Sequence, residues 1–183
     1  MALLKLTDSR YEEIKEIVVE TFEKYDIHCV PISGFELASK MGTKIIPYSA
    51  YPLAVQEKMM AESEDGFSVM RNGQWYIFYN DSKSYGRINN TIMHENGHIV
   101  LDHTEDSELA EAEAKYFAKY ALAPPVLIHK LELKTAQEIS EHFEISFEAA
   151  IYALSFYHKW LQYGGKYYTD YEIKICTLFG IAV

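Results

Sequence analysis

The sequence predicts an α+β fold in which a small antiparallel or mixed sheet packs on two long helices, with a helical part at the C-terminal end. Two β-rich runs, 67–71 and 74–79, are joined by an Asn-Gly pair, which is a strong signal for a two-residue hairpin turn. Apolar residues then recur at helical spacing through 84–101 and through 107–124. Strands followed by runs of helices are typical of the α+β class.

Capping and turn signals place the other elements. In an S-x-x-E pattern, a serine and a glutamate satisfy free backbone N–H groups at the start of a helix, and this pattern occurs at Ser9 and at Ser33. Pro47 confines its strand to an edge or an end of the sheet. The expected elements are a helix from Ser9, a short helix from Ser33, a strand at 43–48, a short helix at 53–63, helices opened by Thr135 and Ser146, and a β-prone tail at 164–183.

Length and composition predict a folded globular protein. The 183 residues are 49% hydrophobic and 14% aromatic, which is enough to form a core. We expect a core domain at 1–134 and, packed on it as one unit, a helical subdomain plus tail at 135–183. Cys29 and Cys176 are isolated from each other, so neither a zinc knuckle nor a redox motif is expected.

Charge and hydropathy exclude several kinds of partner. Seventeen Lys and Arg against 27 Asp and Glu give a net charge of −10, which opposes nonspecific binding to nucleic acid or anionic lipid and favours a basic protein partner. No segment approaches the roughly 18 to 20 apolar residues of a membrane span, and residues 1–9 hold too short an apolar run for a signal peptide. We therefore expect a cytoplasmic protein. The helix pair around 144–146 superficially looks like a helix-turn-helix, but its second helix lacks the basic and amide side chains of a recognition helix.

The pattern H-E-x-x-H, at His94, Glu95 and His98, carries the chemistry. On a helix, two histidines four residues apart project from one face, as a tetrahedral zinc ion requires of two neutral nitrogen ligands. Glu95 would lie close enough to the open position of the metal to act as general base. The alternatives are an exposed helix face or a hydrogen-bonded core histidine. The apolar residues around the motif argue against them, because polar groups inside an apolar helix need partners.

The third ligand is expected from the second long helix. One stripe of mostly small residues runs along that helix: Ala110, Glu113, Ala114, Phe117, Ala118 and Ala121. A buried carboxylate needs a cation or several hydrogen bonds, so we predict that Glu113 completes the metal site. Two alternatives stay open. Glu113 forms a salt bridge with a lysine or arginine such as Arg87, or the ligand is Glu111, which lies on the other side, where it can pair with Lys115 in solvent.

The spacing excludes the metzincin pattern H-E-x-x-H-x-x-G-x-x-H. Leu101 and Thr104 stand at the positions of its glycine and third histidine. His103 is one residue off, and we expect it at the helix end or near the metal ligands rather than on the metal.

The strand at 75–79 precedes the histidine helix by a short polar link. It could bind a substrate backbone by strand addition, or it is an ordinary core strand, and both can hold.

Taken together, these motifs resemble the ImmA/IrrE family of zincin-like metallopeptidases. The resemblance spans about residues 9–160 and rests on Arg87, Thr91, His94-Glu-Asn-Gly-His98, Leu101, Glu113-Ala-Lys-Tyr-Phe-Ala118 and Pro124. The family usually has asparagine where this chain has Lys115, which leaves ligation intact, and leucine or isoleucine where it has Asn96. The tail from Gly164 has no recognised counterpart.

The resemblance implies zinc on His94, His98 and Glu113, with Glu95 as base and proton shuttle. It also implies a cytoplasmic endopeptidase, often from a phage or mobile element, that cuts a helix-turn-helix repressor and thereby regulates genes. A second class stays open, a non-catalytic regulator or toxin–antitoxin component of the same fold that acts by binding. An intact Glu95 favours the enzyme, because a purely structural zinc site needs no general base.

Overall fold

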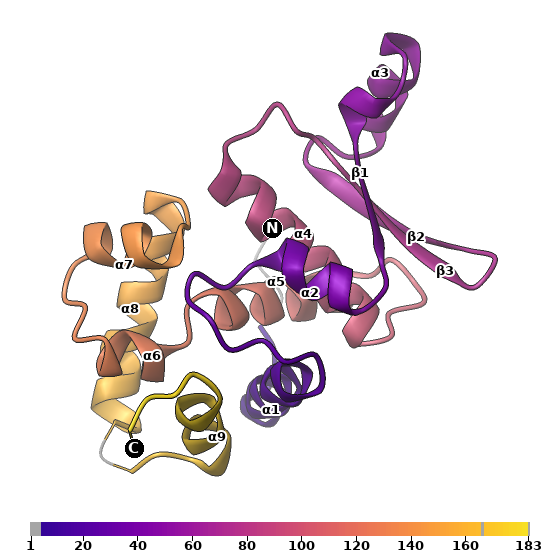
Figure 1. Ribbon diagram of the computed structural model, residues 1–183. Helices are drawn as coiled ribbons and strands as arrows, with labels where there is room; N and C mark the ends of the chain where they lie inside the picture. Colours follow the sequence, from indigo (N-terminus) through magenta and orange to yellow (C-terminus); the bar gives the residue numbers. More distant parts are fainter. Residues whose placement is uncertain (1–4, 166, 183) are drawn as a thin grey trace.

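A computed structural model describes residues 5–165 and 167–182 of the chain (Figure 1). Some of the N-terminal residues on which the expectation of no signal peptide rests lie outside the described residues, as do residues 166 and 183 of the predicted tail. The elements are α1 (Asp8–Lys24), α2 (Gly34–Lys40), β1 (Lys44–Pro47), η1 (Tyr48–Ala50), α3 (Leu53–Glu62), β2 (Gly66–Arg71), β3 (Gln74–Tyr79), α4 (Tyr85–Val100), α5 (Glu108–Leu122), α6 (Pro125–Lys130), α7 (Ala136–Phe143), α8 (Phe147–Tyr163) and α9 (Asp170–Leu178).

The predicted α+β class is confirmed. The strands form one mixed sheet in the order β1-β3-β2, in which β1 runs parallel and β2 antiparallel to β3. The sheet packs on α4, and α5 packs on another side of the same helix (Figure 1). This arrangement makes α4 the central helix of the N-terminal part, with the sheet and α5 positioned around it.

Side-chain caps fix most of the predicted helix starts. Ser33, Thr135 and Ser146 each accept a hydrogen bond from a backbone N–H in the first turn of the helix that follows. The first helix starts slightly earlier than predicted, because the hydroxyl of Thr7 accepts from the N–H of Arg10 at 3.3 Å. Ser9 therefore lies inside α1.

The hairpin forms as predicted, but its second strand is not available for strand addition. β3 lies in the middle of the sheet and is paired on both sides, with β1 and with β2. The alternative that Trp75–Tyr79 binds a substrate backbone is therefore wrong. Among the described residues, β2 pairs only with β3, so the outer edge of β2 is an open one.

Two glycines allow the neighbours of α4 to approach it closely. A Cβ atom on Gly66 of β2 would lie 2.7 Å from Thr91 Cγ2 and 2.7 Å from the carbonyl oxygen of Phe78. A Cβ on Gly97 of α4 would lie 3.1 Å from the ring of Phe117 in α5. The stripe of small residues predicted on α5 contributes to the same contact, since Ala114 and Ala118 are buried. The sheet, α4 and α5 are thereby held in a fixed spacing.

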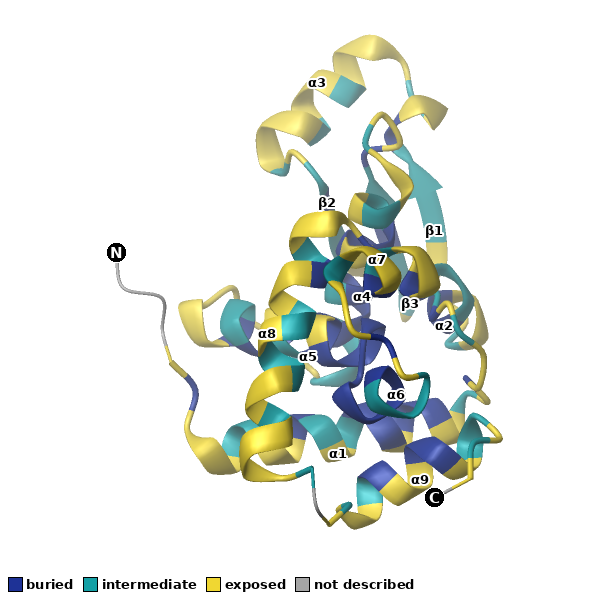
Figure 2. Cartoon of the chain, turned by 90° about the vertical axis from the view of Figure 1, so that its left-hand side faces the viewer, coloured by how far each residue is buried: buried dark blue, intermediate teal, exposed yellow. Residues whose placement is uncertain are grey.

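The main core extends from the N-terminal to the C-terminal helices. Phe22 of α1, Phe117 of α5, Phe143 of α7 and Cys176 of α9 belong to one cluster of buried side chains. Figure 2 shows α5 and α6 largely buried, whereas α3 is largely exposed. The division at residue 134 stays a prediction, because core residues come from both parts.

The prediction of a β-prone tail at 164–183 is wrong for the described residues. Residues 170–178 form α9, which begins with a capping box between Thr169 and Glu172. Its buried face carries Ile175 and Cys176. The β-branched and aromatic residues of this segment favoured a strand, but the capping box and the packing of α9 on α1 and α6 override that propensity.

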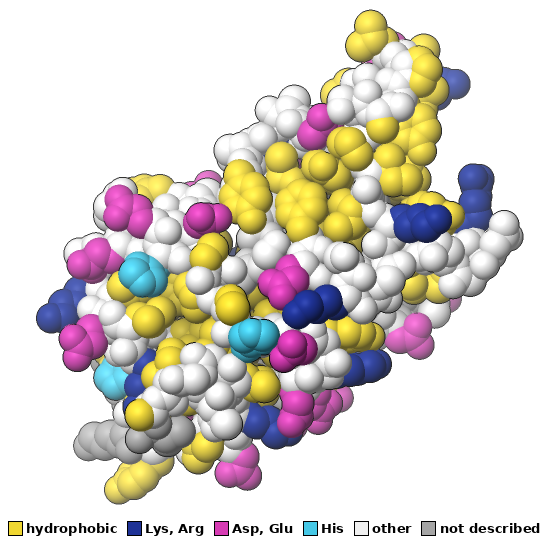
Figure 3. Space-filling model, in the orientation of Figure 1, with side chains coloured by type: hydrophobic (Ala, Val, Ile, Leu, Met, Phe, Trp, Pro, Cys, Tyr) yellow, Lys and Arg dark blue, Asp and Glu magenta, His cyan; other side chains and the backbone are white. Residues whose placement is uncertain are grey.

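Hydrophobic side chains gather on the face between α2 and α3 (Figure 3). Phe35 of α2 packs against Tyr79 of β3 and Tyr85 of α4, with ring centroids 5.5 and 6.4 Å apart.

Within the described chain, no helix combines the length and the hydropathy that crossing a membrane requires.

Candidate metal centre

The two histidines of the motif lie on one face of α4, as predicted. His94 and His98 are one helical turn apart, and their Nε2 atoms approach to 3.0 Å. Both side chains are 16% exposed, so each is largely buried but still in contact with solvent. The two ring nitrogens converge on a single point beside the helix.

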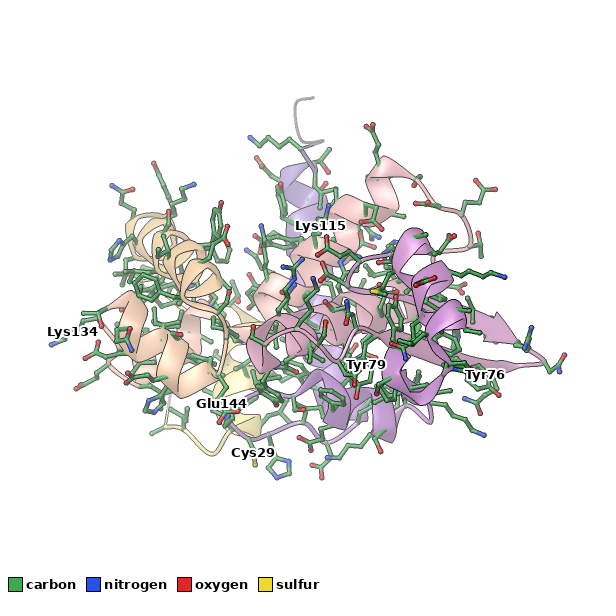
Figure 4. All side chains as sticks on the ribbon, turned by 90° about the horizontal axis from the view of Figure 1, so that it is seen from above. Cys29, Tyr76, Tyr79, Lys115, Lys134 and Glu144 are labelled. Atoms are coloured by element: carbon green, nitrogen blue, oxygen red, sulfur yellow. The ribbon has the colours of Figure 1, made fainter. Side chains whose placement is uncertain are left out.

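The carboxylate that meets the histidines belongs to Glu111 of α5. Its Oε1 lies 3.1 Å from His98 Nε2, and its Oε2 lies 3.6 Å from His94 Nε2. One donor atom from each of the three side chains falls within 4.8 Å of the others, an arrangement that could hold a metal ion. Glu111 also pairs with Lys115, 3.7 Å away, on the outward side of α5 where that lysine lies (Figure 4). The predicted solvent pair therefore forms in addition to the contact with the histidines.

Both kinds of ligand are held in the form that binds a cation. Burial lowers the pKa of His98 to about 4, and the electrostatic influence of the His94 ring adds to this effect. The pKa of Glu111 falls to about 2, chiefly through His94, although His98 Nε2 is the nearer atom. At neutral pH His98 is uncharged with a free lone pair and Glu111 is an anion, which is what a metal requires of imidazole and carboxylate ligands.

Glu113 is buried as predicted, but it does not face His94 and His98. Arg10 of α1 donates to it twice, from Nε to Oε1 at 2.7 Å and from Nη2 to Oε2 at 2.8 Å. Its Oε2 also lies 2.9 Å from His103 Nε2. The predicted placement of Glu113 at the metal site is therefore wrong. The alternative that Glu113 forms a salt bridge is correct, but its partner is Arg10. Arg87, the partner suggested from the sequence, pairs with Asp65 instead.

Glu95 points to the other side of the site, towards the sheet. It is 7% exposed, and its Oε2 accepts a hydrogen bond from the hydroxyl of Ser68 in β2 at 2.7 Å. Burial raises the pKa of this carboxyl above its usual value, while Ser68 holds it down. A raised pKa makes this carboxylate a stronger base than an ordinary glutamate, as a general base beside the candidate metal site would need to be.

Two residues of this region were not identified from the sequence. Ser68 lies in the hairpin, on the face of the sheet that packs against α4. The alternation of side chains along a strand predicts which residues of β2 share a face, but it does not predict which of them lies opposite Glu95. Arg10 lies 103 residues from Glu113, and nothing local marks such a pair.

One comparison with known proteins identifies the family. Residues 50–155 match the model of the Peptidase_M78 family, described as the IrrE N-terminal-like domain. The matched segment contains the hairpin, both histidines and Glu111. Comparison with individually curated proteins gave no match. Because the matched segment covers more than half of the chain and includes every residue of the candidate metal centre, this protein belongs to the IrrE N-terminal-like family of peptidases.

Proposed function

We propose that this protein is a zinc-dependent, site-specific endopeptidase with His94, His98 and Glu111 as metal ligands and Glu95 as general base. The observation that carries the proposal is the convergence of two imidazole nitrogens and one carboxylate beside a second, buried carboxylate. A purely structural zinc site is usually closed by four protein ligands, whereas a catalytic one has three and keeps a position open. The donor set found here has three members, and Glu111 is 40% exposed.

The donor chemistry supports zinc as the ion. Two imidazoles and one carboxylate form a zinc-binding set of hydrolytic enzymes. When bound, a zinc ion supplies a Lewis acid that polarises a peptide carbonyl and activates water. The movement of protons is then carried out by the protein's own side chains. Glu95 takes up a proton at its carboxylate and delivers it to the leaving amine, and burial keeps its pKa raised for this task.

The open edge of β2 supports an extended peptide as substrate. Ser68 of β2 contacts Glu95 directly, so this edge strand runs beside the base. The unpaired backbone groups of an edge strand can hydrogen-bond a peptide in extended conformation. We place the substrate backbone on β2, in place of the β3 position excluded by the sheet order.

We further propose that the substrate is a DNA-binding repressor with a helix-turn-helix domain. The net charge of −10 favours encounter with a basic protein over nucleic acid itself. The resemblance to ImmA/IrrE peptidases, whose members release genes by cutting such repressors, provides the substrate class. Cleavage of a repressor would make the protein a regulator of gene expression, as expected for a phage or mobile element.

The experiment is a paired test of metal content and cleavage. Protein purified without added metal or chelator should contain about one zinc per chain. Glu111→Gln should lose it, whereas Glu95→Gln should keep zinc and lose cleavage of a co-expressed helix-turn-helix repressor by about 10²- to 10⁴-fold. If wild type and Glu95→Gln inactivate the repressor equally without cutting it, the protein acts by binding, as a non-catalytic regulator or toxin–antitoxin component would.

A further inference from the structure

A chain of hydrogen bonds leads from the metal centre to the N-terminal helix. His98 approaches the metal position with Nε2, and its other nitrogen, Nδ1, lies 2.9 Å from His103 Nδ1. His103 Nε2 in turn lies 2.9 Å from Glu113 Oε2. Arg10 completes the chain by donating to both oxygens of Glu113. These four side chains come from α4, the turn after it, α5 and α1.

The chain permits only one assignment of the ring protons that leaves the metal position free. Glu113, bound by a guanidinium at both oxygens, is a carboxylate and can only accept hydrogen bonds. His103 must therefore donate from Nε2. A neutral imidazole has one N–H, so Nδ1 of His103 accepts, and the donor to it is Nδ1 of His98. The remaining nitrogen of His98, Nε2, then carries no hydrogen, and its 3.1 Å approach to Glu111 Oε1 brings two lone pairs to the metal position.

The other protonation patterns would block the site. If His103 donated from both nitrogens, Nδ1 of His98 would have to accept. The hydrogen of neutral His98 would then sit on Nε2 and point at His94 and Glu111. The geometry opposes this, because the contact of His103 Nε2 with Glu113 already uses the single N–H of a neutral His103, and its Nδ1 is left to accept from His98.

Burial holds this series of hydrogen bonds in place, so that it can impose one tautomer on His98. The side chains of His103 and Glu113 are only 11% and 8% exposed, so water cannot readily substitute for either partner. An ion pair this buried is favourable only when its remaining hydrogen-bonding capacity is satisfied. His103 satisfies it for Glu113. By contrast, the contact of Arg10 with Glu13, which is 58% exposed, contributes little.

We propose that His103 and Glu113 are positioning residues that hold His98 in the tautomer with Nε2 free for the metal, and that Arg10 anchors them to α1. The proposal rests on the proposed metal site of His94, His98 and Glu111. It assigns Glu113 a function other than ligation and makes metal affinity depend on the docking of α1. Partners that orient a ligating histidine typically change metal affinity 10- to 100-fold when mutated.

The first test reads the tautomer directly in metal-free, full-length protein. A long-range ¹H–¹⁵N NMR spectrum distinguishes protonated from bare ring nitrogens. We expect His98 to be protonated at Nδ1 in the wild type. In Glu113→Gln an amide N–H₂ can donate to His103, so His98 should show a mixture of tautomers. Glu108→Gln, the same change on an exposed residue of α5, is the control. A wild-type His98 protonated at Nε2 would overturn the proposal whether or not the protein is a peptidase.

The second test measures zinc affinity by competition with a chromogenic chelator. Glu113→Gln and His103→Phe should each weaken binding by about 10- to 100-fold, and the double variant should be no weaker than the stronger single one, because both break one chain. Arg10→Lys, which keeps the charge but not the two-pronged contact, should fall between them and wild type. Unchanged affinity in Glu113→Gln and His103→Phe would overturn the positioning role and leave the proposed function intact.

Cobalt substitution separates a positioning residue from a ligand. The visible spectrum of bound Co²⁺ reports the ligands, so it should stay that of wild type in Glu113→Gln and change or disappear in Glu111→Gln. The reverse result would make Glu113 the ligand and refute the proposal. If the wild type binds neither metal, the proposed function is refuted. The tautomer of His98 can still be measured in that case, because the first test uses metal-free protein.

Discussion

Removing the hydroxyl of Ser68 should make Glu95 harder to ionise. The bond from Ser68 Oγ to Glu95 Oε2 is 2.7 Å long and is made to a group that is 7% exposed. Hydrogen bonds to charged groups contribute about 1.5–3 kcal/mol. Ser68→Ala should therefore lower the ratio of ionised to protonated Glu95, at a given pH, by about ten- to a hundredfold.

The direction follows from the two opposing influences on this carboxyl. Burial raises the pKa of Glu95, and the hydroxyl of Ser68 lowers it. Without the hydroxyl, burial acts with less opposition and the pKa rises further. The acidic limb of the pH profile for cleavage, which reports ionisation of the base in the free enzyme, should move to higher pH in the variant.

The assay is an NMR titration of the side-chain carboxyl carbon of Glu95, assigned by its absence in Glu95→Gln. Ser68→Thr restores a hydroxyl and should return the titration towards wild type. Ser82→Ala removes a hydroxyl bonded to Asn80, away from Glu95, and should leave the titration unchanged. A Ser68→Ala protein with a native spectrum and an unshifted Glu95 titration would refute the reasoning.

Two further predictions concern stability. Gly97→Val should destabilise the protein by about 1–3 kcal/mol in denaturant unfolding, because the new side chain would meet Phe117 and the backbone of Ala114 at 3.1–3.3 Å. The control is Gly164→Val, whose Cβ would have no neighbour closer than 3.6 Å. Equal losses of stability in the two variants would contradict this account. Arg10, and then His103, lower the pKa of Glu113 below its ordinary 4.5, so the carboxylate stabilises the fold above that pH and the contribution is lost as pH falls through the lowered value. The difference in unfolding free energy between wild type and Glu113→Gln should shrink on acidification, and a difference that grows instead would show that the ion pair is not stabilising.

Local signals were sufficient for much of the fold. Asn72-Gly73, with positive φ at both residues, forms the hairpin turn that such pairs favour. Ser33, Thr135 and Ser146 cap helices where the sequence predicts helix starts. Each of these interactions lies within a few residues of chain, so the sequence alone contains both partners. The order of the strands was not predictable in this way, because β1 pairs with β3 across the intervening β2.

The sequence spacing also predicted the part of the candidate metal centre that lies on α4. His94, Glu95 and His98 are adjacent along α4, and helix geometry alone brings the two histidines together. The contact of Glu95 with Ser68 could not be predicted, since it depends on how the sheet packs on α4. Gly66, which lies two residues before Ser68, determines that packing through its close approach to Thr91.

The different surroundings of Glu111, beside His94 and His98, and of Glu113, beside Arg10, show what a buried carboxylate does and does not indicate. Two residues apart on a helix, they point about 200° away from each other, and Glu113 does lie on the buried face of α5. Burial predicts that such a group has a cation, but the cation can be an arginine from any part of the chain, and here it is Arg10. A catalytic metal needs an open position, so its ligands lie where solvent and substrate can enter. The 40% exposure of Glu111 is the expected property of such a ligand, and full burial of a glutamate on the second helix is an argument for a supporting role.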